Sequence, residues 1–345
     1  MGLLIAVVVV ALIFDYTNGF HDTANAIATS VSTRALSPKV AVLGAAFFNF
    51  AGAFISIHFL HGAVASAVGK GIVNQAYVDQ PFILAALLGA ISWNLITWRF
   101  GLPSSSSHAL IGGLVGAMIA KVVVTPDLTA GPGVQWSGLV DKVIIPMVAS
   151  PFFGFIAAYF LMTGLFWLVR NRSPQPTNRL FRRIQPLAAM YMAWAHGAND
   201  AQKTMGVIAM ALVAYNTIPG QAPPAFYVPT WVVLICAMAM ALGTYSGGWR
   251  IIHTLGSKVI KLDPIHGFVA ETTAATVITL GTRLGMPLST THVITSTIMG
   301  TGATQRLSAV KWGVAGNIMT AWVLTIPAAG SLAAAAFLAL RPFLY

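Results

Sequence analysis

The chain is a succession of long apolar runs separated by short polar segments. Each run approaches or exceeds the roughly 20 residues that a helix needs to cross the hydrocarbon core of a bilayer. The predicted membrane helices are residues 2–30, 38–63, 81–99, 104–122, 142–169, 185–213, 229–248, 266–282, 288–302 and 309–339. Polar clusters predict helix interruptions near Asn18–Asp22 and His196–Asp200, and the last run is long enough for two pieces. The predicted fold class is an all-α polytopic membrane protein with broken or re-entrant helices.

The composition agrees with this class. Of the 345 residues, 57% are hydrophobic and 8% are charged, whereas a soluble domain carries about 25% charged residues. The net charge of +11 does not indicate a nucleic-acid partner, because its arginines and lysines are dispersed over short loops, as on the cytoplasmic side of membrane proteins. The expected surroundings are lipid. The lone Cys236 excludes an intramolecular disulfide and a cysteine-based metal site.

Two sequence blocks occur twice, in the same order. "GFHDTANA" (Gly19–Ala26) resembles "GANDAQKT" (Gly197–Thr204), and "RFGLPSSSSH" (Arg99–His108) resembles "RLGMPLSTTH" (Arg283–His292). Such self-similarity indicates a duplication. The predicted organisation is a first membrane repeat over residues 1–168, a basic cytoplasmic linker over 169–184 and a second membrane repeat over 185–345.

Equivalent loops of the two repeats differ in charge. "STRALSPK" (Ser32–Lys39) is basic and its counterpart "YNTIPGQAPP" (Tyr215–Pro224) is uncharged, whereas "VTPDLTAGPG" (Val124–Gly133) is acidic and "TQRLSAVK" (Thr304–Lys311) is basic. Because basic loops stay in the cytoplasm, the repeats are predicted to be inverted, with both termini extracytoplasmic. Inverted repeats are typical of secondary transporters, whose ligands bind near the membrane midplane at broken helices.

The first pair of blocks places a carboxylate at the same position of each repeat, Asp22 and Asp200. Amides accompany them: Asn18 and Asn25 in the first repeat and Asn199 in the second. Carboxylate and amide oxygens are ligands for a small hard cation, and buried carboxylates in membranes are usually functional. We expect a sodium site at each motif. The alternative is a hydrogen-bonded cluster that only packs helices together.

The second pair of blocks combines hydroxyls with a proline. Pro103 and Pro287 suit the first turn of a helix, and a half-helix that starts inside the membrane presents free N–H groups and a positive dipole end. Two such ends would hold a tetrahedral oxyanion, although serines in membrane helices often bond only their own backbone. A serine hydrolase is disfavoured because one active site needs no second nucleophile motif, so no catalytic residue is predicted. The expected phosphate ligands here are Ser105, Ser106, Ser107, Ser289, Thr290 and Thr291.

Other polar residues at membrane depth leave alternatives open. Lys203 replaces Asn25 in the second repeat, where it either contacts the anion or neutralises a cation site. Glu271 has no counterpart and would bind a cation or carry a proton. Asp141 and Asn317 occupy matched positions and either line a shared cavity or only pack.

These blocks, from Asn18 to about Gly330, resemble the PiT family of inorganic phosphate transporters. One departure is Phe20–Asp22, where the family has Ala-Asn-Asp. The resemblance implies inward cotransport of phosphate with sodium or protons, in some members as a metal–phosphate complex, and a homodimer. It also implies that the ion and substrate centre contains Asp22, Asn25, Asn199 and Asp200 and that the six hydroxyls cradle phosphate.

The predicted function is a sodium–phosphate symporter of the cell membrane that works by alternating access. It is not an enzyme and needs no cofactor. Coupling to protons is the alternative, favoured by Glu271 and by the histidines His108 and His292, and the rival class is a passive anion channel. Phosphate would be repelled by Asp22 and Asp200 unless cations are bound, so the affinities for anion and cation should be linked.

Overall fold

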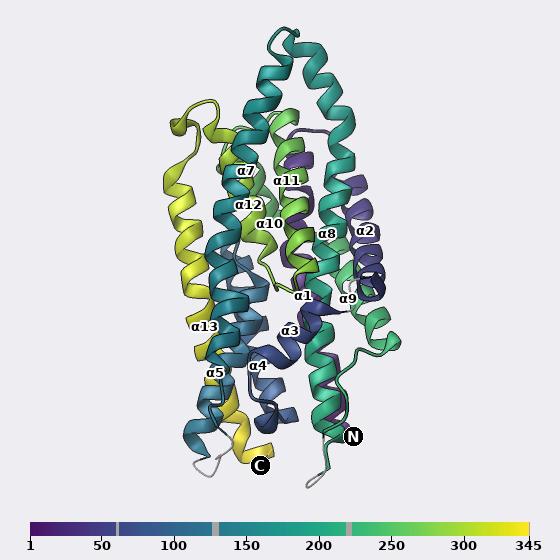
Figure 1. Ribbon diagram of the computed structural model, residues 1–345, viewed down its shortest axis with the longest axis vertical. Coiled ribbons are helices and arrows are strands. Elements are labelled where there is room, and N and C mark those ends of the chain that lie inside the picture. Colours follow the sequence, from purple (N-terminus) through teal and green to yellow (C-terminus); the bar gives the residue numbers. More distant parts are fainter. Residues whose placement is uncertain (60–61, 126–130, 219–222, 345) are drawn as a thin grey trace.

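Helices form nearly the whole of the computed structural model, which describes residues 1–59, 62–125, 131–218 and 223–344 (Figure 1). Short π-helical turns follow α6 and α10, at Val140–Ile144 and Thr254–Lys258. The helices are α1 (Gly2–Ser32), α2 (Pro38–Phe59), α3 (Ala63–Gly71), α4 (Gln80–Phe100), α5 (Ser106–Val124), α6 (Trp136–Leu139), α7 (Ile145–Val169), α8 (Pro174–Asn216), α9 (Thr230–Ser246), α10 (Trp249–His253), α11 (Pro264–Arg283), α12 (Thr290–Ala303) and α13 (Trp312–Leu344).

Several helices are long and apolar enough to cross a membrane. Within the described residues there are six such stretches: α1, residues 38–57 of α2, α4, α5, residues 136–169 and α13. A seventh span results if α9 is joined to residues 249–258, to which it is bent by 59°. The prediction of an all-α polytopic membrane protein is therefore confirmed.

The two predicted interruptions near Asn18–Asp22 and His196–Asp200 are wrong, because α1 and α8 run unbroken through both aspartate motifs. The glycines in these motifs serve helix packing instead. A Cβ atom on Gly19 would overlap a backbone carbonyl of α9, and one on Gly197 would overlap a backbone carbonyl of α2. Small residues at such crossings let helix backbones approach closely in a membrane.

Three further boundaries differ from the prediction. The basic linker is mostly helical, since the turn after α7 is short and α8 already begins at Pro174. The final run forms one helix despite Pro327 within it. The predicted span 38–63 divides into α2 and the separate short helix α3. Residues 60–61 of that span and Asp127 of the predicted acidic loop lie outside the described residues.

Two helical hairpins are formed by α4 with α5 and by α11 with α12. Each turns at a glycine in the left-handed region, Gly101 (φ 64°) and Gly285 (φ 68°), a conformation that glycine adopts without steric cost. Pro103 and Pro287 lie three residues before the first helical residue, so their predicted place in the first helical turn is wrong. From the two turns, α5 runs toward the end that carries both termini and α12 toward the α7–α8 turn (Figure 1).

The two halves of the chain exchange packing partners. Helix α5 of the first half packs on α13 of the second, and α12 of the second packs on α7 of the first. In the same way α1 packs on α9 and α2 on α8. Gly116 of α5 faces Gly330 of α13, where there is no room for a Cβ atom. The packing of α1 on α9 in one half is thus matched by that of α8 on α2, and the packing of α5 on α13 by that of α12 on α7. This exchange brings both aspartate motifs and both serine motifs to one centre.

Candidate substrate and ion site

The candidate site lies where α1 and α8 pass the first residues of α5 and α12. It is closed: every side chain in it is at most 3% exposed. It contains most of the predicted ligands together: Asn18, Asp22, Asn25, Ser105, Ser106, Ser107, Asn199, Asp200, Lys203, Ser289, Thr290 and Thr291.

The two half-helices begin with the same cap. The Oγ of Ser105 accepts a hydrogen bond of 3.2 Å from the backbone N–H of His108, and the Oγ of Ser289 accepts one of 3.2 Å from His292. A capping serine satisfies one of the free N–H groups of a helix start. The hydroxyls of the next two residues, 106–107 and 290–291, contact the aspartate motifs.

Asp22 is surrounded by oxygen atoms. The Oγ of Ser106 lies 2.6 Å from both Asp22 Oδ2 and Asn18 Oδ1. The other carboxylate oxygen lies 2.7 Å from His21 Nδ1 and 3.4 Å from the Oγ1 of Thr291. A hydroxyl carries one proton, so Ser106 donates to only one of its two close oxygens. The oxygens of Ser106, Asn18 and Asp22 thus lie together with only the Ser106 hydroxyl proton between them. A bound cation would fit this site because it would interact favourably with all three oxygens.

Asp200 has a different partner, the ammonium of Lys203. The Nζ of Lys203 lies 2.6 Å from Asp200 Oδ1 and 2.8 Å from the carbonyl of Leu288, and it also donates to the Oγ of Ser107. The Oγ1 of Thr290 lies 3.4 Å from Asp200 Oδ2. The repeat-related aspartates thus have unlike electrostatic surroundings.

The two aspartates belong to one centre. One ligand atom each of Asp22, His196 and Asp200 lies within 4.8 Å of the others. The Nε2 of His196 lies 3.3 Å from Asp200 Oδ2. The sequence predicted a cation at each motif, and the geometry brings the two motifs into contact range of one another.

Two of the three predicted amide ligands, Asn25 and Asn199, each leave a carbonyl oxygen free. Asn25 Nδ2 donates to Thr290 (3.2 Å) and Thr291 (2.9 Å), and Asn199 Nδ2 donates to Thr282 (2.7 Å). Both Oδ1 atoms are buried without a hydrogen-bond partner among the described residues. A buried polar atom without a partner is costly, and a cation would remove that cost.

Glu271 lies in a separate buried cluster between α1, α8 and α11. Its Oε1 accepts hydrogen bonds from Thr29 and from Ser30 (2.8 Å), and Gln185 donates to Thr29 (3.3 Å). The Oε2 has no hydrogen-bond partner within the described part of the chain. Glu271 therefore joins the helices that hold both aspartate motifs.

Asp141 and Asn317 are absent from this centre. Both side chains are exposed, the first on the π-helical turn after α6 and the second on α13. Of the two alternatives that the sequence left open, a shared cavity or packing alone, neither describes these exposed side chains. Their matched positions in the repeats reflect the duplication, which preserves exposed as well as buried positions.

Sequence reasoning missed a third carboxylate, Asp15, which is fully buried. Its Oδ1 accepts a hydrogen bond of 2.9 Å from Thr204, and its Oδ2 has no hydrogen-bond partner among the described residues. Asp15 and Asp22 are two helical turns apart and so share a face of an unbroken helix. The predicted interruption of α1 concealed this signal.

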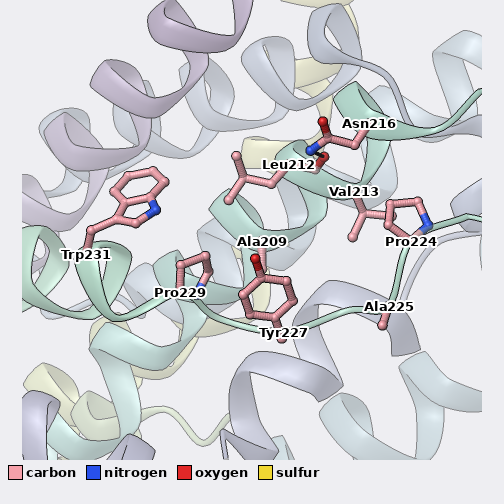
Figure 2. A pocket seen from close by; sticks show the side chains of 9 residues that line it. All are labelled: Ala209, Leu212, Val213, Asn216, Pro224, Ala225, Tyr227, Pro229 and Trp231. Carbon is pink, nitrogen blue, oxygen red and sulfur yellow. Dashed lines mark hydrogen bonds between the residues drawn. The ribbon is translucent and has the colours of Figure 1, made fainter.

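Three cavities of the described part of the chain are lined by residues outside the centre. Figure 2 shows one of about 150 Å³ beside the last turns of α8, lined mainly by apolar side chains and without any predicted ligand. Cavities of about 410 Å³ and 480 Å³ adjoin the turns at Gly101 and Gly285, with Arg250 and Lys70 among their lining residues. Each of these two turns leads directly into a serine half-helix.

A helical membrane protein with a closed centre of carboxylates, hydroxyls and a lysine is a transporter by architecture. The model of the family described as "Phosphate transporter family" matches residues 18–333. The chain belongs to this family, whose members are transporters and not enzymes.

Relatives of known name agree with the family match. A "Probable low-affinity inorganic phosphate transporter" of Rhizobium meliloti (strain 1021) is 49% identical over 338 residues, which cover 98% of this chain and 96% of the relative. One of Bacillus subtilis (strain 168) is 44% identical, covering 98% and 97%. A solved structure described as "The sodium-dependent phosphate transporter" is 25% identical, with a TM-score of 0.85 and full coverage of both chains.

Proposed function

We propose that this protein imports inorganic phosphate by symport with sodium, through alternating access to the closed centre. One observation carries the proposal: hydrogen bonds and an ion pair link the starts of both serine half-helices to both aspartate motifs. Ser106 and Thr291 contact Asp22, whereas Thr290 contacts Asp200 directly and Ser107 does so through Lys203.

Phosphate is the anion that fits this geometry. The starts of α5 and α12 direct free N–H groups and the positive ends of two helix dipoles into the centre. The hydroxyls of Ser106, Ser107, Thr290 and Thr291 and the amide of Asn25 add donors, and Lys203 adds a positive charge. A tetrahedral oxyanion with several acceptor oxygens uses donors from both sides at once. The names of the relatives agree with this substrate.

Sodium is the cation that the oxygen ligands favour. One hydroxyl proton, that of Ser106, lies between the acceptor oxygens of Asn18 and Asp22 and can bond to only one of them. Among the described residues, the side-chain carbonyl oxygens of Asn25 and Asn199 accept no hydrogen bond. Such hard oxygen atoms suit an alkali cation rather than a transition metal. The similar solved structure is that of a sodium-dependent transporter, which supports the same ion.

The same charges explain the coupling. Asp200 is paired with the Lys203 ammonium, whereas the carboxylate of Asp22 repels phosphate until a cation neutralises it, so each ligand raises the affinity for the other. Each net positive charge that enters gains about 2.3 kcal/mol per 100 mV of membrane potential. Coupling to sodium therefore allows phosphate to accumulate.

Alternating access follows from the arrangement of the halves. The partner exchange of α5 with α13 and α12 with α7, and the opposite directions of the two half-helices in Figure 1, support an inverted repeat. Both termini lie at one end and the arginine-rich α7–α8 turn at the other. The positive-inside rule then assigns the termini to the outside of the cell membrane. A homodimer is part of the proposal.

Two alternatives to sodium symport are proton coupling and a passive anion channel. The Glu271 cluster beside both aspartate helices favours proton coupling. A passive anion channel would use the same hydroxyls, but the closed centre and the carboxylates of Asp15, Asp22 and Asp200 obstruct an anion pore.

The experiment is uptake of radiolabelled phosphate into proteoliposomes with a sodium gradient, a proton gradient or neither. Accumulation above equilibrium only with sodium is expected; accumulation with protons alone, or equilibration without any gradient, would reject the proposal.

A further inference from the structure

Lys203 has the surroundings of a bound alkali cation. It is 1% exposed, and its Nζ contacts three kinds of oxygen: a carboxylate (Asp200, 2.6 Å), a carbonyl (Leu288, 2.8 Å) and a hydroxyl (Ser107). Carboxylate, carbonyl and hydroxyl oxygens are also the ligands expected around sodium at Asp22. The ammonium carries the same single positive charge as sodium.

The first repeat lacks such a group. Asn25 occupies the position that corresponds to Lys203, and its amide donates to the hydroxyls of Thr290 and Thr291. Among the described residues, no lysine or arginine forms an ion pair with Asp22. The duplication therefore placed two carboxylates in one centre, of which only Asp200 pairs with a covalently attached cation.

We infer that Lys203 is a tethered substitute for one coupling ion, so that sodium binds at the Asp22 motif and not at the Asp200 motif. This inference rests on the proposed sodium symport. The transporter would then use one sodium ion fewer per phosphate than a version of the site with an asparagine in both repeats. Lys203 would neutralise Asp200 in every state of the cycle, because it cannot leave.

The stoichiometry limits accumulation. Each coupled sodium ion contributes its own electrochemical gradient to the accumulation of phosphate. With one sodium ion fewer per cycle and no membrane potential, a tenfold sodium gradient therefore supports a maximal inside-to-outside phosphate concentration ratio that is about tenfold lower. In exchange, uptake would need less sodium for half-maximal rate and would depend on its concentration less steeply.

The test is the Lys203→Asn variant, which gives the second repeat the residue of the first. Sodium-22 binding to the purified protein should reveal one more saturable sodium ion per chain than in the unmodified protein. Phosphate uptake by proteoliposomes should depend more steeply on sodium, with the sodium-to-phosphate flux ratio increased by one. Binding is measured without transport, so it remains decisive if the variant transports slowly.

Two further variants serve as controls. Lys121→Asn removes another buried lysine, which pairs with Asp79 outside the centre, and should leave the number of bound sodium ions unchanged. Lys203→Met supplies neither charge nor ligand and should not gain a sodium ion. A Lys203→Asn protein that melts cooperatively and binds no additional sodium would overturn the inference. Sodium-independent uptake by the unmodified protein would instead reject the proposed function.

Discussion

The Asp200–Lys203 pair gives the sharpest energetic prediction. Asp200→Asn keeps the shape of the side chain but removes the charge that lies 2.6 Å from a buried ammonium. Breaking a buried ion pair by removing one partner typically costs 3–5 kcal/mol. Lys203 would retain the carbonyl of Leu288 and the hydroxyl of Ser107, so we expect the lower end, about 3 kcal/mol.

The double variant Asp200→Asn/Lys203→Asn removes both charges and should recover most of that loss. The assay is thermal unfolding of the purified proteins in one detergent, where a loss of about 3 kcal/mol lowers the melting temperature by roughly 5 °C. Asp22→Asn is the matched control, because among the described residues no lysine forms an ion pair with that carboxylate; it should abolish sodium dependence with a smaller loss of stability. A double variant whose loss equals the sum of the single losses would refute the reasoning, since independent groups give additive effects.

Four other substitutions test separate parts of the account. Ser106→Ala removes one of three clustered oxygens, and the sodium concentration for half-maximal phosphate uptake should rise about 10- to 100-fold. Gly116→Leu would force a side chain into the backbone of Gly330, and the melting temperature should fall with a loss of about 2 kcal/mol or more; an unchanged melting curve would contradict the crossing. Asp141→Asn and Asn317→Ala change exposed side chains, so sodium-driven uptake should stay within about twofold, and a larger loss of rate would return them to the site.

The sequence predicted the helical membrane fold because apolar runs of span length have few other solutions in lipid. It also predicted which motifs meet, since the duplication makes Asp22 equivalent to Asp200. The prediction that the helices break at both aspartate motifs was wrong, because α1 and α8 are continuous there. A glycine beside polar residues in a helix is compatible with a break and with a close helix crossing, and only the position of α9 against Gly19 distinguishes them.

The sequence also could not decide how each residue is used. Lys203 was compatible with an anion contact or with a neutralised cation site, and its contacts with Asp200 favour the latter. Asp15 was missed because the interruption predicted near Asn18–Asp22 separated it from Asp22, and its burial beside Thr204 depends on the packing of α1 on α8. Asp141 is matched by Asn317 in the second repeat, but its side chain is exposed. Which face of a helix is buried depends on the helices that pack against it, and the sequence match does not reveal them.

The central claim is that one closed centre binds sodium and phosphate together. The most direct measurement is binding of radiolabelled phosphate to the purified protein at several sodium concentrations, and of sodium at several phosphate concentrations. The account predicts that each ligand raises the affinity for the other by the same factor, as linkage requires, and that Asp22→Asn abolishes this effect. Phosphate binding that is independent of sodium would contradict it.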